Sequence, residues 1–254
     1  MALGLGRTVP PGPPLVRAVA TATPKHTESG SPVRWRREQV LFRIDASLIE
    51  AFPASKDAVS AAFGAWSGVV PGVPELAITD DPSAPNVVSL APAGMVLPTN
   101  ALAVTRLTFS SDTGEIVRAE ILVDASAHSF SVRDAGDTRD EHEDATDATF
   151  DLQSVIAHET GHALGLGEDY EDGRATMFVR ATPGDVSKRE LSAADRAAVA
   201  SAYEGDTGAA ASKKACAVAA PGAPGESGLT CIGVAVLLAW GVRRRLRRPR
   251  AHSA

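Results

Sequence analysis

The sequence predicts an α+β domain in which a twisted sheet of five strands packs against helices. Two kinds of observation support this fold class. Several short segments alternate apolar with other residues at a period of two, which is typical of strands with one buried face. Three longer segments place apolar residues three and four positions apart, which is typical of helices with one buried side.

The expected strands occupy the first half of the chain. From Trp35 onward, Val40, Phe42 and Ile44 recur at every second position. The five predicted strands are residues 40–44, 76–79, 86–90, 101–109 and 115–123. Residues 110–114 join the last two and are rich in turn-forming residues, so we expect these two strands to form a hairpin.

Two of the expected helices frame the domain. The first follows Pro53, a residue that is tolerated in a first helical turn. Within it, Phe63 and Trp66 recur at helical spacing, and we interpret them as core that backs the sheet rather than as a platform for substrate. The last helix is predicted at Ser192, whose side chain and Asp195 form a capping box.

Composition divides the chain into four parts. Its 254 residues, 44% of them hydrophobic, are sufficient for one soluble domain with tails. The predicted parts are a disordered N-terminal segment at 1–34, the folded domain at 35–205, a linker at 206–228 and an apolar segment with an arginine cluster at 229–250. The N-terminal segment lacks the unbroken apolar stretch of a secretory signal. Both cysteines, Cys216 and Cys231, lie beyond the folded domain, so we expect no disulfide framework within it.

The most informative residues lie on the remaining helix. His158 and His162 are four residues apart and therefore project from the same helical face, where both imidazoles can bind one metal ion. Glu159 lies beside them. This H-E-x-x-H spacing suits zinc, with Glu159 as the base that accepts a proton from a metal-bound water. Such a pentapeptide also occurs by chance in unrelated helices, so the motif alone leaves both interpretations open.

The residues after the motif favour the metal site. Gly165 can end the helix in a left-handed conformation and turn the chain back. The turn would bring Glu168 and Asp169 towards the metal, and either carboxylate would be an acceptable third zinc ligand. A methionine, Met177, follows in Ala175-Thr176-Met177-Phe178.

With this extension and Met177, the chain resembles the metzincin clan of zinc proteases and, within it, the matrixins. The resemblance covers about residues 35–205 and is strongest at 155–178. It implies a zincin fold, zinc held by His158, His162 and Glu168, Glu159 as general base, and Met177 beneath the metal. The third histidine of the metzincin pattern is absent, because Glu168 stands at its position with Asp169 next to it.

The expected function is therefore zinc-dependent hydrolysis of peptide bonds. The resemblance also suggests that the second hairpin strand, or its neighbour, borders the cleft and pairs with the backbone of a peptide substrate. A different class remains open: a metzincin scaffold that has lost full zinc ligation and binds peptides or proteins at a cell surface. A third is a zinc hydrolase that acts on a non-peptide amide.

A second metal was considered for the acidic run at residues 134–151. Its carboxylates, which include Asp140, Glu141, Glu143 and Asp144, make a calcium site conceivable. The spacing matches no calcium loop, and runs of charge usually form solvated loops. His128, just before this run, is interpreted as a loop histidine rather than as a metal ligand.

The C-terminal segment has a different composition. Residues 229–242 are apolar and are followed by an arginine cluster at 243–250. As a helix, 14 residues would span about 21 Å, less than the hydrocarbon core of a membrane. With the cysteine and Pro/Gly spacer before it, the segment resembles the C-terminal sorting segments of exported myxobacterial proteins. This implies a bacterial cell-surface or extracellular location, with the segment as a possible membrane anchor. The net charge of −6 argues against nucleic acid as a partner, and a monomer is expected.

Overall fold

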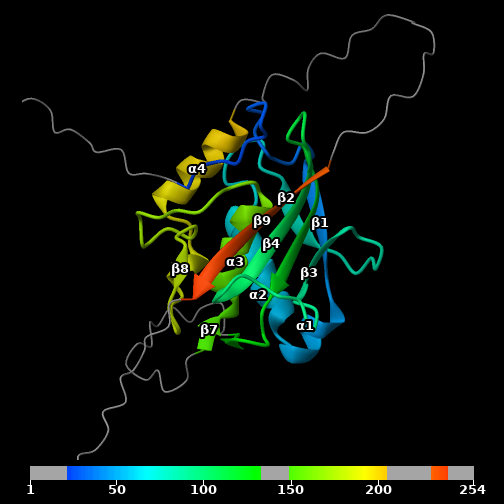
Figure 1. Ribbon diagram of the computed structural model, residues 1–254, viewed down its shortest axis with the longest axis vertical. Helices are drawn as coiled ribbons and strands as arrows, with labels where there is room; N and C mark the ends of the chain where they lie inside the picture. The colour runs from blue at the N-terminus through cyan, green and yellow to red at the C-terminus, as the bar shows by residue number, and fades with distance from the viewer. Residues whose placement is uncertain (1–21, 133–148, 205–229, 240–254) are drawn as a thin grey trace, which may run out of the picture.

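The protein forms one large mixed sheet with two of its longer helices packed against one face (Figure 1). The computed structural model describes residues 22–132, 149–204 and 230–239. Seven strands make up the sheet in the order β2-β1-β3-β5-β4-β9-β8. Their bounds are β1 Gln39–Ile44, β2 Glu75–Ile78, β3 Asn86–Leu90, β4 Ala101–Ser110, β5 Ile116–Val123, β8 Arg180–Ala181 and β9 Thr230–Ala239.

The five predicted strands all form, and they are consecutive neighbours in this sheet. β1, β2, β3 and β5 pair in parallel, and β4 pairs antiparallel with β5 through the predicted hairpin. The prediction of a five-stranded sheet was nevertheless incomplete, because β9 and β8 extend it beyond β4. Two short parallel strands, β6 Ser129–Ser131 and β7 Thr149–Asp151, form a separate small sheet.

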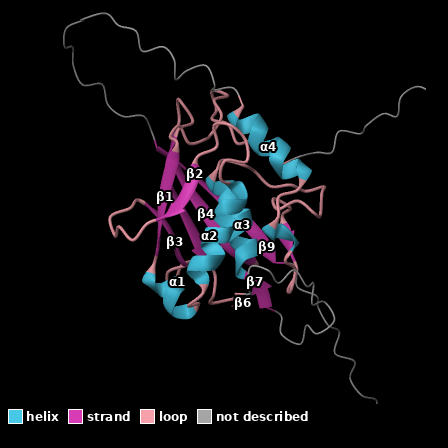
Figure 2. Ribbon diagram, turned by 180° about the vertical axis from the view of Figure 1, so that it is seen from behind, coloured by secondary structure: helices cyan, strands magenta, loops and turns pink. Residues whose placement is uncertain are grey.

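Three of the helices agree with the sequence prediction. They are α2 Ser55–Trp66, α3 Leu152–Ala163 and α4 Ala193–Tyr203, and the predicted capping box of Ser192 and Asp195 starts α4. The short helix α1 Ala46–Ala51 and the 3-10 turn η1 Ser187–Arg189 were not predicted. Figure 2 shows α2 and α3 side by side against the sheet, and the main hydrophobic core lies between these layers. Trp66 is fully buried there, and its Nε1 donates to the carbonyl of Ala157 at 2.8 Å.

The N-terminal boundary of the domain lies earlier than residue 35. Ala22 and Val33 are each only 1% exposed, so residues 22–34 belong to the fold and were wrongly included in the disordered segment. The backbone N–H of Lys25 donates to the carbonyl of Gly165, and its carbonyl accepts from Val33. The first of these contacts is made with distant backbone, so the Pro- and Ser-rich local composition gave no indication of it.

The apolar C-terminal segment is extended rather than helical. Thr230–Ala239 forms β9, antiparallel to β4 and parallel to β8. The backbone hydrogen bonds that a helix would make within itself are thus made with two neighbouring strands. Among the described residues, no helix has the length and apolar character needed to cross a membrane.

Candidate metal centre

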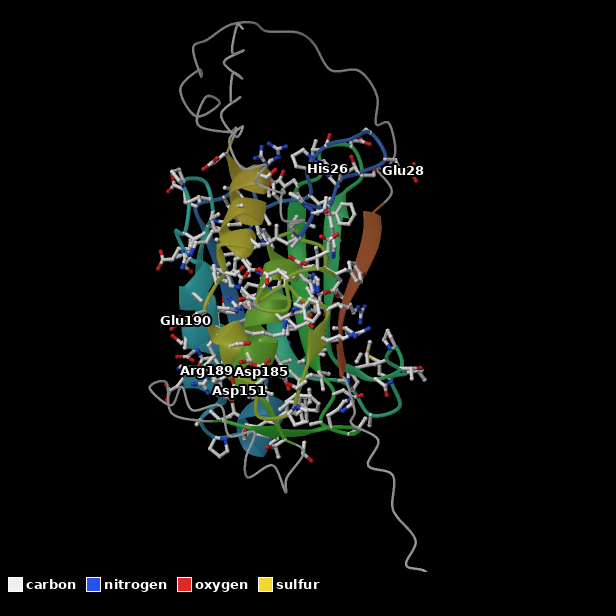
Figure 3. The ribbon with its side chains drawn as sticks, turned by 90° about the vertical axis from the view of Figure 1, so that its left-hand side faces the viewer. His26, Glu28, Asp151, Asp185, Arg189 and Glu190 are labelled. Atoms are coloured by element: carbon white, nitrogen blue, oxygen red, sulfur yellow. The ribbon has the colours of Figure 1, made fainter. Side chains whose placement is uncertain are left out.

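Helix α3, which carries the H-E-x-x-H motif, is buried along its whole length. Asp151 caps its first turn by accepting a hydrogen bond from the backbone N–H of Ser154 at 2.9 Å. Arg189 donates to both carboxylate oxygens of Asp151, at 2.7 and 2.9 Å, and the two residues are labelled in Figure 3. This ion pair joins the start of α3 to η1, and it fixes where the helix enters the core.

Both motif histidines are oriented by backbone carbonyls. The Nδ1 atom of His158 lies 2.7 Å from the carbonyl of Thr176, and that of His162 lies 2.9 Å from the carbonyl of Leu166. A carbonyl only accepts hydrogen bonds, so each Nδ1 carries the proton and each Nε2 keeps its lone pair. This is the tautomer that binds a metal through Nε2.

Glu168 is the third residue of the cluster. Gly165 ends the helical region with φ +93°, as the sequence predicted, and a β-carbon at this position would overlap the carbonyl of Val33. The turn brings the Glu168 carboxylate to 3.3 Å from the Nε2 atoms of both His158 and His162. One potential ligand atom from each of the three residues lies within 4.8 Å of the others.

The cluster meets the requirements of a zinc site. The two Nε2 atoms and Glu168 Oε2 are buried, and within the described part of the chain none of them has a hydrogen-bond partner. Buried polar atoms are seldom left in this state, and three of them around one point are explained by a shared cation. Two imidazoles and a carboxylate are a ligand set that zinc accepts.

The protonation states suit metal binding. Burial lowers the pKa of His158 and lowers the pKa of His162 to about 4, so both rings are neutral at pH 7. The pKa of Glu168 is lowered to about 2, so its carboxyl is ionised at pH 7. The cluster therefore presents two neutral nitrogen donors and one carboxylate at neutral pH.

Asp169, the alternative third ligand, forms hydrogen bonds with the backbone of the turn that follows it. Its Oδ1 atom accepts hydrogen bonds from the backbone N–H groups of Glu171 and Asp172, and its own N–H donates to the carbonyl of Met177. The structure thus places Asp169 in the turn behind the cluster, whereas Glu168 points at the histidines.

The segment around Met177 packs against α3 next to His158. Met177 is fully buried, and its sulfur packs against Gly161. Asp195, at the start of α4, accepts from the backbone N–H groups of Thr176 at 2.8 Å and Met177 at 3.0 Å. Because the Thr176 carbonyl orients His158, Asp195 links helix α4 to the position of a motif histidine.

Two further residues adjoin Glu159, and the sequence gave no functional role to either. Thr105 of β4 donates to the Glu159 carboxylate, with 2.6 Å between Oγ1 and Oε2. Lys25 interacts electrostatically with both Glu159 and Glu168, and burial lowers its pKa. Thr105 lies between Ala103 and Leu107 on the face of β4 that packs against α3. A polar residue at such a buried position was the signal in the sequence that could have indicated a functional role. Lys25 lies in the segment expected to be disordered.

The comparison with protein families agrees with this geometry. Residues 104–204 match the family model of the matrixins. The matched region runs from within β4 to the end of α4, and it includes all the residues of the cluster, Glu159 and Met177. The chain thus contains a matrixin-like metzincin region, and this indicates a zinc metalloprotease. A search of curated proteins found no significant match.

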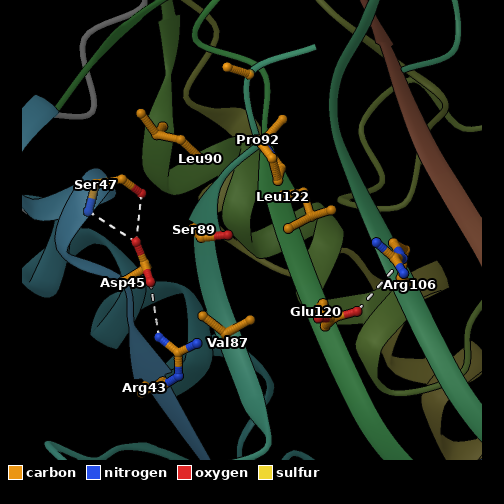
Figure 4. Close-up of a pocket in the computed structure, with 12 residues that line it drawn as sticks. Arg43, Asp45, Ser47, Val87, Ser89, Leu90, Pro92, Arg106, Glu120 and Leu122 are labelled. Carbon is orange, nitrogen blue, oxygen red and sulfur yellow. Dashed lines mark hydrogen bonds and ion pairs between the residues drawn. The ribbon is translucent and has the colours of Figure 1, made fainter. Parts of the chain in front are cut away.

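A hollow of about 500 Å³ lies away from this cluster. It opens on the other face of the sheet, beside the ion pairs Arg43–Asp45 and Arg106–Glu120 (Figure 4). Side chains alternate along β4, so Arg106 points away from the face on which Thr105 contacts Glu159. This hollow is therefore separate from the candidate centre.

The sequence offered two other metal candidates, the acidic run and His128. Most of the acidic run considered for calcium, including Asp140 and Glu141, lies outside the described residues. His128 packs edge-on against the ring of Phe150, with 5.8 Å between ring centroids. Within the described residues, the group that could hold a metal is His158, His162 and Glu168.

Proposed function

We propose that this protein is a zinc-dependent endopeptidase in which His158, His162 and Glu168 hold the metal and Glu159 is the general base. The observation that carries the proposal is the convergence of three buried ligand atoms without hydrogen-bond partners, next to a glutamate on the same helix. When bound, zinc would supply Lewis acidity to the scissile carbonyl and would lower the pKa of a water molecule.

The residues around Glu159 suit a proton-transfer role. The hydrogen bond from Thr105 holds the carboxylate in one orientation, and α3 keeps it beside the histidines. In the proposed reaction, Glu159 accepts a proton from the attacking water and delivers it to the nitrogen of the leaving amine. The products are a carboxylate and an amine.

The substrate is proposed to be an extended peptide. β4 is the last of the five strands in the continuous run β2-β1-β3-β5-β4, and its hydroxyl-bearing Thr105 touches Glu159. A peptide paired with β4 would pass close to the general base while its backbone groups satisfy those of the strand. The second hairpin strand, β5, lies between β3 and β4 in the middle of this run, whereas the other edge of β4 is paired with β9, which follows the run in the sheet.

The test is zinc content together with cleavage of fluorescein-labelled casein by the full chain. We expect a single bound zinc ion and cleavage that Glu159→Gln abolishes while zinc remains bound. Glu168→Gln should weaken zinc binding by more than the roughly 10- to 100-fold typical of changes outside the ligand set. The matched control Asp169→Asn should keep the zinc.

Two results would contradict the proposal. Unchanged zinc affinity in Glu168→Gln would remove the proposed third ligand. A folded chain without zinc that binds casein and leaves it intact would instead support the degenerate peptide-binding scaffold.

We also propose a bacterial cell-surface or extracellular location, with the C-terminal segment directing export. This rests on the sequence pattern of residues 206–250. Fractionation of cells that express the full chain, or a chain ending at Gly205, provides the test. Equal distribution of the two chains would reject a sorting role.

A further inference from the structure

The most unusual pairing in the sheet is that of β9 with its two neighbours. β9 lies between β4 and β8, antiparallel to the first and parallel to the second (Figure 1). Most of β4 and all of β8 lie within the matrixin-like region at 104–204, whereas β9 begins at Thr230, well after it. A segment from outside the matched region thus completes the sheet at this edge.

The space that β9 fills has the width of one strand. Neighbouring strands lie about 4.8 Å apart, so the edges of β4 and β8 would be about 10 Å apart without β9 between them. Both edges would then present backbone N–H and C=O groups to the same space. A single extended peptide satisfies both sets, and β9 shows the polarity it must take.

This space adjoins the candidate catalytic residues. Thr105, whose hydroxyl contacts Glu159, is the register partner of Ala235 in β9. β8 begins three residues after Met177, and β9 also lies beside α3. The central part of β9 therefore runs along the strand that carries the contact to the proposed general base.

We propose that residues 230–239 act as an intramolecular occupant of the peptide-binding slot between β4 and β8, so that β9 must leave before a peptide substrate can enter. This inference rests on the proposed function for the identity of the slot. Because β9 is part of the same chain, its pairing is intramolecular, and an external peptide lacks this advantage. Full-length protein is then held in a low-activity state.

The register offers a direct way to lock β9 in place. Phe109 of β4 is the register partner of Cys231, and directly opposed residues in antiparallel strands have Cα atoms about 4.5–5.5 Å apart, within the range of a disulfide. The variant Phe109→Cys, made with Cys216→Ser to remove the other thiol, should form an intrachain disulfide on mild oxidation. The control Thr108→Cys should not, because its side chain points to the opposite face of the sheet.

The locked and unlocked chains should differ in activity. Oxidation of Phe109→Cys should lower the rate of fluorescein-casein cleavage by at least about tenfold, and reduction with a phosphine should restore it. The double variant Ala235→Pro with Val236→Pro should raise the rate above that of the parent. The N–H groups of adjacent residues in a strand point to opposite sides, so one of the two N–H groups in this pair faces β4. Proline has no N–H group, so the double variant loses that hydrogen bond to β4. Ala251→Pro, beyond β9, is the control and should match the parent.

A binding measurement separates this inference from the proposed function. In the Glu159→Gln background, fluorescence anisotropy should show labelled casein bound by the reduced chain and excluded from the disulfide-locked one. If the chains that keep Glu159 cleave no casein, but the reduced Glu159→Gln chain binds it and the locked one does not, the slot assignment stands and the proposed activity fails. No disulfide with Phe109→Cys, or equal casein binding by locked and reduced chains, would overturn the inference.

Discussion

The sulfur of Met177 packs against Gly161 of α3 so closely that a β-carbon at residue 161 would overlap it. The same β-carbon would lie 2.9 Å from Cζ2 of Trp66. Gly161 stands between the two motif histidines in the sequence, so the absence of a side chain there lets both the methionine segment and α2 approach the helix that carries the motif.

This relationship reverses the usual effect of Gly→Ala in a helix. Gly161→Ala should lower the free energy of unfolding by about 1–3 kcal/mol, because overpacking outweighs the gain of about 0.5–1 kcal/mol in helix propensity. Gly64→Ala in α2, where nothing lies within 4 Å of the new β-carbon, should raise it. Urea unfolding of both variants measures the difference, and stabilisation by Gly161→Ala would contradict the packing argument.

The buried pair of Asp151 and Arg189 should be important for stability. Arg189→Met leaves the Asp151 carboxylate buried without its cation, and we expect a loss of about 3–5 kcal/mol. The control is Lys56→Met, which removes an exposed partner of Asp80 and should cost no more than about 1 kcal/mol. Thermal or urea unfolding tests this, and similar losses in the two variants would be evidence against a structural role for the buried pair.

Lys25 should weaken metal binding by its charge. It interacts electrostatically with Glu159, Glu168 and His162, so its positive charge opposes a cation placed among them. Lys25→Met should therefore increase zinc affinity by at least about threefold in competition with a chelator. The control Lys56→Met, at an exposed position, should leave the affinity unchanged; a lower affinity in Lys25→Met would show that the side chain supports the site instead.

Thr105 should act on the reaction and not on the metal. Thr105→Val removes the hydrogen bond to Glu159 while keeping the shape of the side chain, and we expect kcat to fall by about tenfold with zinc content unchanged. Thr105→Ser keeps the hydroxyl and should recover most of the rate. An equal loss of kcat in both variants would show that packing, rather than the hydrogen bond, is responsible.

The metal-free protein should lose stability in acid through His162. The pKa of this residue is lowered by burial to about 4 in the folded chain, against about 6.5 when unfolded. Between these pH values, residue 162 is protonated in the unfolded chain and neutral in the folded chain. The contribution of neutral His162 to the free energy of unfolding is therefore fully present above pH 6.5 and is lost as the pH falls towards 4. Urea unfolding in EDTA from pH 7 to 4 should fall more steeply for the parent than for His162→Leu, and parallel curves would contradict the assignment.

Local sequence patterns determined much of this protein. Alternation predicted β1 to β5, helical spacing predicted α2 and α3, and the capping box predicted the start of α4. These features depend on neighbours within one strand or one helical turn, and such information is present in a short stretch of residues. The motif also placed His158 and His162 on one helical face.

Only the tertiary structure decided the rest. Lys25, Thr105 and Asp195 reach the centre from separate parts of the chain, and hydrogen bonds across such distances leave no periodic trace in the sequence. An apolar run such as residues 229–242 is compatible with a helix or with a buried strand, so the local sequence alone does not decide its conformation. The strand form at 230–239 follows from the backbone groups that β4 and β8 offer. This partner geometry is absent from the local sequence, and it brings β9 to the proposed peptide-binding edge.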